Sequence, residues 1–234
     1  RANTNNNDYE LIVVDNNSAD SSLDYLRTLK WIKLIERKDD VPKGGSPAQG
    51  TALDIALANA TGEFFLALHS DTFVRRSDWL NFLKKKLSEK NYACAGTGKL
   101  DTKPRVIKFL KEITDFKKLH KYLTGNKKEI FYIRAICAIY KTEILIENNL
   151  SFAKNTDSGV TCAKQLYLDL LDRGYQCNKI SPYEMAEYIL HLEHATMAIN
   201  PEFHIREKTK TKYKRNFHKA ISSPEIQKII SPPD

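Results

Sequence analysis

The sequence predicts an α/β fold in which a mostly parallel sheet is flanked by helices. Short apolar runs alternate with helix-like segments through residue 99, and such alternation is typical of strands joined by crossover helices. Two of the apolar runs end in polar residues, the first at Asp15 and the second at His69, Ser70 and Asp71. Ligands of open α/β sheets bind beside the carboxyl ends of the strands, so these residues mark a candidate site.

The first half of the chain contains a regular series of predicted elements. Four short apolar runs predict strands, at residues 10–15, 31–36, 63–68 and 92–99. Leucines at helical spacing predict a helix over residues 23–29. Ser46 is expected to cap the next helix, with Pro47 at its first position and Gly62 at its end. Ser77 is expected to cap a third helix, whose leucines face inward and whose lysines face solvent.

The second half of the chain is less regular. Periodicity predicts helices over residues 104–123, 141–148 and 161–172 and a strand over 130–140. From about residue 202 the sequence is polar and basic and ends in a proline-bearing tail. We therefore expect residues 1–200 to form a single domain and residues 201–234 to form a basic C-terminal extension.

The composition narrows the class of protein. With 234 residues, 41% of them hydrophobic, the chain is long enough for one sizeable globular domain. No apolar run reaches the roughly 18 residues of a membrane-spanning helix, and residues 1–8 lack the apolar core of a signal peptide. Its four cysteines are scattered without a CxxC pair, which favours structural thiols in a reduced, cytoplasmic protein over a disulfide framework or a zinc site.

The net charge of +8 is concentrated in basic runs, above all residues 208–219. Such a run is either a solvated face or a surface that attracts phosphates, anionic lipid or nucleic acid, and charge alone does not choose among these. Nucleic acid is the least favoured partner, because the aromatic residues are not interleaved with the basic runs in a recognisable stacking module.

Four segments stand in a specific order along the chain. They are YELIVVDNNSADSS (9–22), GTALDIALANATGEFFLALHSDTFVRRSDWL (50–80), ICAIYKTEILIENNLSF (136–152) and LDRGYQ (171–176). In order and spacing they resemble the family 2 glycosyltransferases, which have the GT-A fold. The resemblance implies a Rossmann-like sheet with a small antiparallel part on the acceptor side. It also implies that the first strand and helix of the family precede Arg1, so we expect roughly 30 further N-terminal residues, the length of a typical βα unit.

The resemblance implies a nucleotide-sugar site at the strand ends. Asp15 matches the aspartate that contacts the nucleotide base, with Asn17 and Ser18 beside it. Residues 69–71 match the D-x-D motif, whose last aspartate, here Asp71, ligates a divalent metal on the donor's diphosphate. Mn²⁺ or Mg²⁺ is expected, because these ions are held by carboxylates together with substrate phosphates, and the ion neutralises charge on the departing diphosphate.

Two positions depart from the family pattern. His69 replaces the first aspartate of the motif, next to Ser70. Either Asp71 alone anchors the metal while His69 hydrogen-bonds the ribose or a phosphate, or the metal site is weakened. Asp54 stands where the family often has asparagine; it either lines the nucleotide pocket or is an exposed helical acid.

Other site residues follow from the same resemblance. The segment HLEHAT resembles a late element in which a histidine completes the metal site, which points to His191 and then to His194. Inverting members use a carboxylate to remove the proton from the acceptor hydroxyl. Asp157 is the candidate base, with Asp169 and Asp172 as weaker choices.

The expected function is transfer of a sugar from a nucleotide diphosphate-sugar to a hydroxyl of a glycan or lipid-linked acceptor, as in polysaccharide biosynthesis. We expect a cytoplasmic enzyme that is inverting and metal-dependent, with a peripheral contact to an anionic membrane at its inner face. The alternative is a non-catalytic nucleotide-sugar or glycan-binding module in which His69 has eroded the metal motif.

Overall fold

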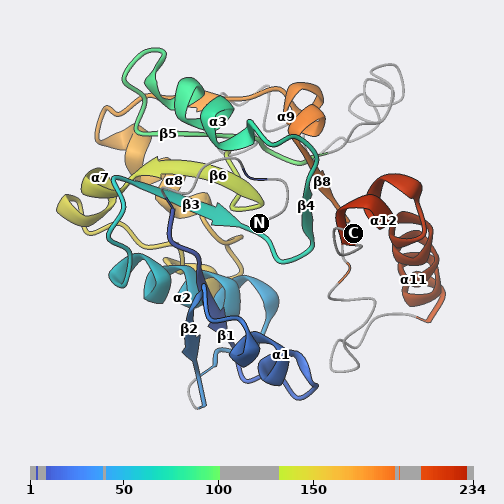
Figure 1. The fold of residues 1–234 in the computed structure, drawn as a ribbon. Coiled ribbons are helices and arrows are strands. Elements are labelled where there is room, and N and C mark those ends of the chain that lie inside the picture. The colour runs from blue at the N-terminus through green and yellow to red at the C-terminus, as the bar shows by residue number, and fades with distance from the viewer. Residues whose placement is uncertain are drawn as a thin grey trace.

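A four-stranded sheet forms the centre of the molecule (Figure 1). In this computed structural model, which describes residues 4, 9–38, 41–100, 132–192, 195 and 207–230, the strand order is β3-β6-β5-β7. The bounds are Phe64–Leu68 for β3, Cys137–Lys141 for β6, Cys94–Gly96 for β5 and Cys177–Lys179 for β7. Strand β6 is antiparallel to both of its neighbours, whereas β5 and β7 are parallel. The predicted α/β class is confirmed, although this sheet is mixed.

Two strand pairs lie outside the central sheet (Figure 1). Strand β1 (Ile12–Asp15) pairs in parallel with β2 (Lys33–Glu36), in keeping with the helix α1 (Ser22–Thr28) that connects them. Strand β4 (Thr72–Val74) pairs antiparallel with β8 (Ile189–His191), so that Thr72 lies opposite His191. The second pair joins the middle of the chain to a segment near its end.

Helices cover both faces of the central sheet. Strand β3 accordingly carries apolar side chains on both of its sides. Phe65 and Ala67 point into a core that contains buried residues of α2 (Gly45–Ala58), α7 (Thr142–Glu147) and α8 (Lys164–Asp172). The alternate side chains of β3 pack against a second core. That core is built by α3 (Trp79–Ser88), α9 (Pro182–Tyr188) and β8.

All four cysteines are free thiols, as the sequence predicted. Burial raises the pKa of Cys137 to about 12, and burial together with the charge of Asp54 raises that of Cys162 to about 12. Thiols that stay protonated are poor nucleophiles and poor metal ligands. These two cysteines are therefore part of the packing.

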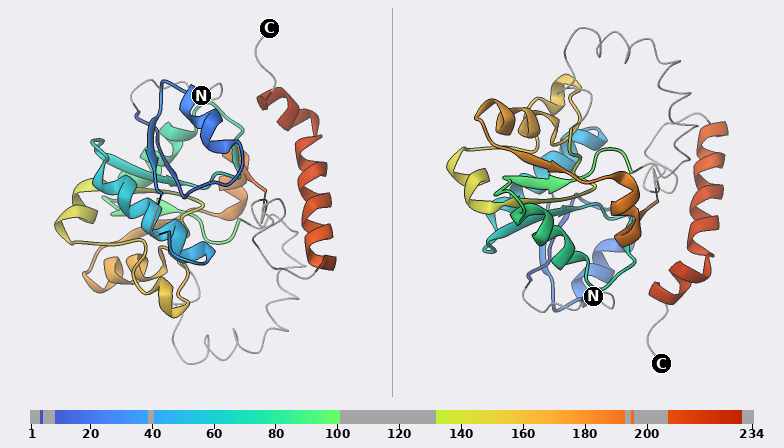
Figure 2. Two further views of the ribbon diagram at one scale, coloured as in Figure 1. Left: turned by 90° about the horizontal axis from the view of Figure 1, so that it is seen from below. Right: turned by 90° about the horizontal axis from the view of Figure 1, so that it is seen from above.

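The basic C-terminal region is helical where the structure describes it. Helix α11 (Glu207–Ile221) and helix α12 (Pro224–Ile230) lie beside the domain, on the side of β4 and β8 (Figures 1 and 2). Among the helices described, none has both the length and the apolar composition required to cross a lipid bilayer.

Several predicted boundaries are wrong. Helix α2 begins at Gly45, after Gly44 as the N-cap, and ends at Ala58, so neither Ser46 nor Gly62 delimits it. Pro47 lies within the first turn, where its missing N–H leaves no hydrogen bond unmade.

Further differences affect the later elements. Asp78, and not Ser77, precedes α3, and α8 begins only at Lys164. Residues 132–136, expected to belong to a strand, precede β6 without forming one. The helix expected over 104–123 lies outside the described residues.

Helix α2 packs closely against the chain segment that follows α7. A Cβ atom built on Gly50 would lie 2.6 Å from the Cα of Ala153 and 3.0 Å from the carbonyl oxygen of Phe152. Both neighbours are backbone atoms, which cannot move aside as a flexible side chain can. Only glycine fits at this contact, which fixes the segment after α7 to the helix.

Replacing Gly50 with alanine therefore tests this packing. We expect Gly50→Ala to lower the free energy of unfolding by about 2 kcal/mol, the cost typical of overpacking a core contact. Gly45→Ala is the matched control, since nothing lies within 4 Å of a Cβ there; it should leave stability unchanged or raise it by up to about 1 kcal/mol. Urea unfolding curves measure both, and equal stability of the two variants would contradict the close contact.

Candidate functional site

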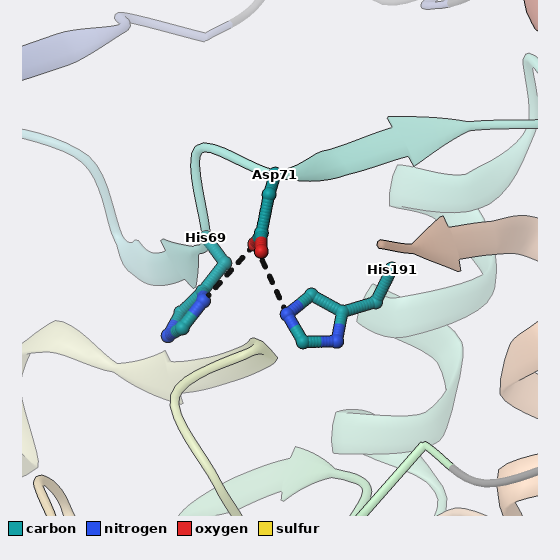
Figure 3. Close-up of side chains that lie close together, drawn as sticks. All are labelled: His69, Asp71 and His191. Atoms are coloured by element: carbon teal, nitrogen blue, oxygen red, sulfur yellow. Dashed lines mark hydrogen bonds and ion pairs between the residues drawn. The ribbon is translucent and has the colours of Figure 1, made fainter. Parts of the chain in front are cut away.

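Three polar side chains meet at the junction of β4 and β8 (Figure 3). The Nδ1 atom of His69 lies 3.2 Å from Oδ1 of Asp71, and Nε2 of His191 lies 3.0 Å from the same oxygen. The two imidazole rings are 5.3 Å apart between centroids and nearly perpendicular, at 72°. We refer to His69, Asp71 and His191 as the His-Asp-His cluster.

Backbone pairing on both sides of a tight turn positions the cluster. The amide of His69 donates to the carbonyl of Ile136 at 2.9 Å, which extends the pairing of β3 with β6. The amide of Thr72 then donates back to the carbonyl of His69 at 3.2 Å. On the other side, the amide of Leu192 donates to the carbonyl of Asp71 at 3.0 Å. Two strand pairs, β3 with β6 and β4 with β8, therefore fix the backbone of the cluster before any ligand binds.

The carboxylate of Asp71 is the electrostatic centre of the cluster. Its side chain is only 9% exposed, and burial alone would raise its pKa. The contacts with His191 and His69 outweigh burial and hold the pKa of Asp71 well below its usual range. Asp71 is therefore ionised at physiological pH and available as an anionic ligand.

The cluster fits a divalent metal ion. Its ligand atoms, two imidazole nitrogens and one carboxylate oxygen, all lie within 4.8 Å of one another. Both ring nitrogens of His191 are buried without a well-oriented hydrogen bond, although Nε2 is close to Asp71. A buried nitrogen in that state is costly unless it gains a partner. Imidazole with carboxylate suits Mn²⁺ and other first-row ions better than Mg²⁺, which prefers oxygen ligands.

The sequence left two alternatives open for His69, and both remain predictions. They placed His69 on the ribose or a phosphate, or took it as a sign of a weakened metal site. In the structure His69 is a third potential ligand beside Asp71. Ser70 lies between them in the turn and is exposed. His194, the second histidine of HLEHAT, lies outside the described residues.

A second polar group lies at the carboxyl end of β1. Asp15 is buried, with 4% of its surface exposed, and its two carboxylate oxygens accept from the backbone amide of Ser18 at 3.0 Å and from its hydroxyl at 2.5 Å. Asn17 adopts the left-handed backbone conformation, with φ of 61°, which asparagine tolerates better than most residues. Asp15 thus closes a tight turn that leaves Asn17 and Ser18 exposed.

Arg37 belongs to the same region and was missed in the sequence. It directly follows β2, and its amide donates to the carbonyl of Asp15, the last residue of β1, at 2.9 Å. Its Nη1 donates to Asn16 Oδ1 and to the Thr51 hydroxyl, both at 2.9 Å. The detectable signal was its position directly after the predicted strand 31–36, since polar residues at strand ends are what identified Asp15.

Asp54 holds the segment after α7 against α2. Its Oδ1 accepts from the amide of Phe152 at 2.7 Å, and its Oδ2 accepts from the hydroxyl of Ser151 at 2.6 Å and the amide of Ala153 at 3.3 Å. Asp54 is half-buried and therefore not an exposed helical acid, whereas its contact with the nucleotide remains a prediction. Asp54 positions the start of the loop that carries Asp157. The side chain of Asp157 is exposed in the short 3₁₀ turn Thr156–Ser158 of that loop.

The weaker candidates for a catalytic base differ from each other. Asp169 is buried, accepts from Gln165 Nε2 at 2.9 Å and pairs with Lys154 Nζ at 2.6 Å. Burial opposes its ionisation, but Lys154 and Gln165 outweigh burial and lower its pKa. Asp169 therefore acts as a structural partner of Lys154. Asp172 is exposed at the end of α8.

The predicted site residues thus form three groups. The His-Asp-His cluster is one, the turn after β1 is the second, and Asp54 with the loop of Asp157 is the third. No hydrogen bond or ion pair joins these groups within the part of the chain that the structure describes.

A substitution at Asp54 tests its role in positioning the loop. We expect Asp54→Ala to lower the free energy of unfolding by about 2 kcal/mol, because buried donors lose their acceptor. Amide exchange at Phe152 and Ala153 should become faster. Asp157→Ala, at an exposed position of the same loop, should change stability by no more than about 0.5 kcal/mol. Unchanged amide exchange in Asp54→Ala would exclude the positioning role.

Comparison with solved structures finds similar chains of low identity. One is the mannosyltransferase PcManGT from Pyrobaculum calidifontis, solved with GDP-Man and Mn²⁺: identity is 22%, coverage is 73% of this chain and 45% of that chain, and the TM-score is 0.49. Another is residues 1–349 of TarS from S. aureus, with 16% identity, coverage of 94% and 66%, and a TM-score of 0.49. The same protein with UDP-GlcNAc gives 18% identity, coverage of 94% and 66%, and a TM-score of 0.46.

The family comparison is more direct. No curated protein matches the chain. The family model described as "Glycosyl transferase family 2" matches residues 1–148, well over half of the 234 residues. That span includes the turn after β1, Asp54, His69 and Asp71. The chain therefore belongs to the family 2 glycosyltransferases.

Proposed function

We propose that this chain transfers a sugar from a nucleotide diphosphate-sugar to a hydroxyl of a glycan or lipid-linked acceptor, with inversion at the sugar and with the help of a divalent metal. The His-Asp-His cluster is the observation that carries the proposal. It occupies the carboxyl end of β3, where the family has its D-x-D motif, and it offers three ligand atoms within 4.8 Å of one another.

The cluster would hold the metal, with Mn²⁺ favoured over Mg²⁺ because two of its ligands are imidazoles. Asp71 is the anionic ligand, and His69 and His191 complete the set. When bound, such an ion neutralises charge on the departing diphosphate. His194 is a further proposed contact to the metal or the diphosphate. Ser70, exposed between two ligands, offers a hydroxyl to the donor.

The turn after β1 would hold the nucleotide. Asp15 reads the base, while Asn17 and Ser18 present exposed polar groups next to it. Arg37 adds a positive charge at the same end of the β1–β2 pair, held in place by Asn16 and Thr51. A guanidinium held in this way can pair with a phosphate or with base oxygens.

Asp157 would remove the proton from the acceptor hydroxyl as that oxygen attacks the sugar. Its exposure fits a group that must reach an acceptor from solvent, and its loop is tied to α2 through Asp54. Asp169 is less suitable because Lys154 and Gln165 occupy its carboxylate. We further propose that the protein works in the cytoplasm, with a peripheral contact to the inner face of an anionic membrane.

Direct metal binding tests the cluster. Titration of the protein with Mn²⁺, followed by calorimetry and by the electron spin resonance of free Mn²⁺, should show one site that binds Mn²⁺ more tightly than Mg²⁺. Asp71→Ala should weaken Mn²⁺ binding by about 100-fold or more, since even outer-shell partners of a metal contribute about 10- to 100-fold. His191→Ala should also weaken it.

The matched control for the metal titration is His218→Ala, which removes an exposed histidine of α11. It should bind Mn²⁺ as the wild type does. Equal Mn²⁺ affinity for the wild type and Asp71→Ala would contradict the metal site.

Hydrolysis of the donor tests the base without knowledge of the acceptor, because water takes the acceptor's place. With a panel of nucleotide-sugars and Mn²⁺, we expect Asp157→Asn to lower kcat by about 10²- to 10⁴-fold and to leave the KM for the donor nearly unchanged. Asp172→Asn is the matched control. Loss of activity in Asp172→Asn with full activity in Asp157→Asn would reassign the base.

The replacement of the motif's first aspartate by His69 favours one second candidate, a nucleotide-sugar or glycan-binding module without catalysis. This candidate predicts that nucleotide diphosphate binds equally well with and without Mn²⁺ and that no donor is turned over. Mn²⁺-dependent binding together with turnover rules it out.

A further inference from the structure

The outward face of α11 carries a straight row of positive charges. Four exposed cations recur at intervals of four, three and four residues, which is one face of an α-helix with 3.6 residues per turn. They are Lys208, Lys212, Arg215 and Lys219. We call them the α11 cation row. Over eleven residues the row extends about 16 Å along the helix.

The opposite face of α11 is partly shielded from solvent. Thr209, Tyr213, Phe217 and Ala220 lie at the complementary helical positions and are half-buried. The cation row therefore lies on the more exposed side of the helix. Figure 2 shows α11 at the margin of the molecule, where an outer face is open to a large partner.

Nothing on α11 neutralises the row. The only carboxylate of the helix is Glu207, in its first turn, and none of the four cations forms an ion pair within the described residues. Like charges three and four residues apart repel each other and destabilise a helix. A helix face that contacts only solvent typically alternates positive and negative side chains. An anionic partner would relieve the electrostatic repulsion within the row.

We infer that the α11 cation row docks the protein electrostatically on an anionic lipid bilayer. A straight row on a convex outer face complements a flat surface of negative headgroups. Single-stranded nucleic acid fits less well, because its bases need aromatic stacking platforms, and Tyr213 and Phe217 lie on the inner face. The apolar side of α11 does not have to enter the bilayer, so the attachment is peripheral and sensitive to salt.

Helix α12 connects this surface to the candidate site. Ile226 of α12 is fully buried, and Glu225 accepts from Arg75 Nη2 at 3.1 Å. Arg75 directly follows β4 and also donates through Nη1 to the carbonyl of Ala186 in α9. A bilayer bound to the row would thus be linked to the strand that begins after Asp71, which suits a lipid-linked acceptor.

This inference rests on the membrane contact in the proposed function, but its test needs no sugar transfer. Sedimentation of the full chain with lipid vesicles measures docking, and donor hydrolysis measures catalysis. Either can fail while the other holds.

The experiment compares vesicles of equal parts phosphatidylglycerol and phosphatidylcholine with vesicles of phosphatidylcholine alone. The test variant combines Lys208→Gln, Lys212→Gln, Arg215→Gln and Lys219→Gln; glutamine keeps a good helix propensity. The control variant combines Lys30→Gln, Lys84→Gln, Lys85→Gln and Lys90→Gln, which are exposed positions elsewhere on the molecule. Both variants lose the same charge.

The wild type and the control should sediment with the anionic vesicles only and be released by added salt. The test variant should have a partition coefficient lower by about 100-fold or more, with its donor hydrolysis in solution unchanged. Equal losses in both variants would overturn the inference, because general charge would explain the binding. So would salt-resistant binding to pure phosphatidylcholine, or preference for a DNA or RNA oligonucleotide over the anionic vesicles.

Discussion

The pairing of β4 with β8 is the constraint on which the candidate site depends. These two short strands place Thr72 opposite His191, and the amide of Leu192 completes the pairing by donating to the carbonyl of Asp71. A shift of one residue in register would turn each side chain of a strand to the other face. The imidazole of His191 would then leave the carboxylate. The same strand pair continues through Arg75 to α9 and α12, so the late part of the chain is organised around it.

The charge of Asp71 adds a second constraint. A nearly buried carboxylate is tolerated only when it is paired, and here the partners are two histidines, one in the turn after β3 and one in β8. A cluster of this kind is stable enough to exist before a ligand arrives, yet one of its imidazoles has no well-oriented hydrogen bond. Because the site is ordered in advance, binding of a ligand carries a smaller free-energy cost for ordering the side chains.

The sequence was sufficient for the local part of the fold. The apolar run of β3 and its polar end were predictable, because a short continuous apolar segment followed by a turn has few other interpretations. Contacts between segments distant in the sequence were not predictable. Strand β8 is only Ile189–His191, too short to show a period, and nothing in the sequence of β6 requires it to run antiparallel to β3. The partners of Asp54 are backbone amides of Phe152 and Ala153, which no side-chain pattern reveals. His191 was found through a family resemblance, and Asp71 through its strand.

Both histidines of the cluster approach a single oxygen, Oδ1 of Asp71. A nitrogen that contacts this oxygen through a proton must present a bare lone pair when it ligates a cation. A cation bound at this cluster would therefore take the place of the protons shared between imidazole and carboxylate.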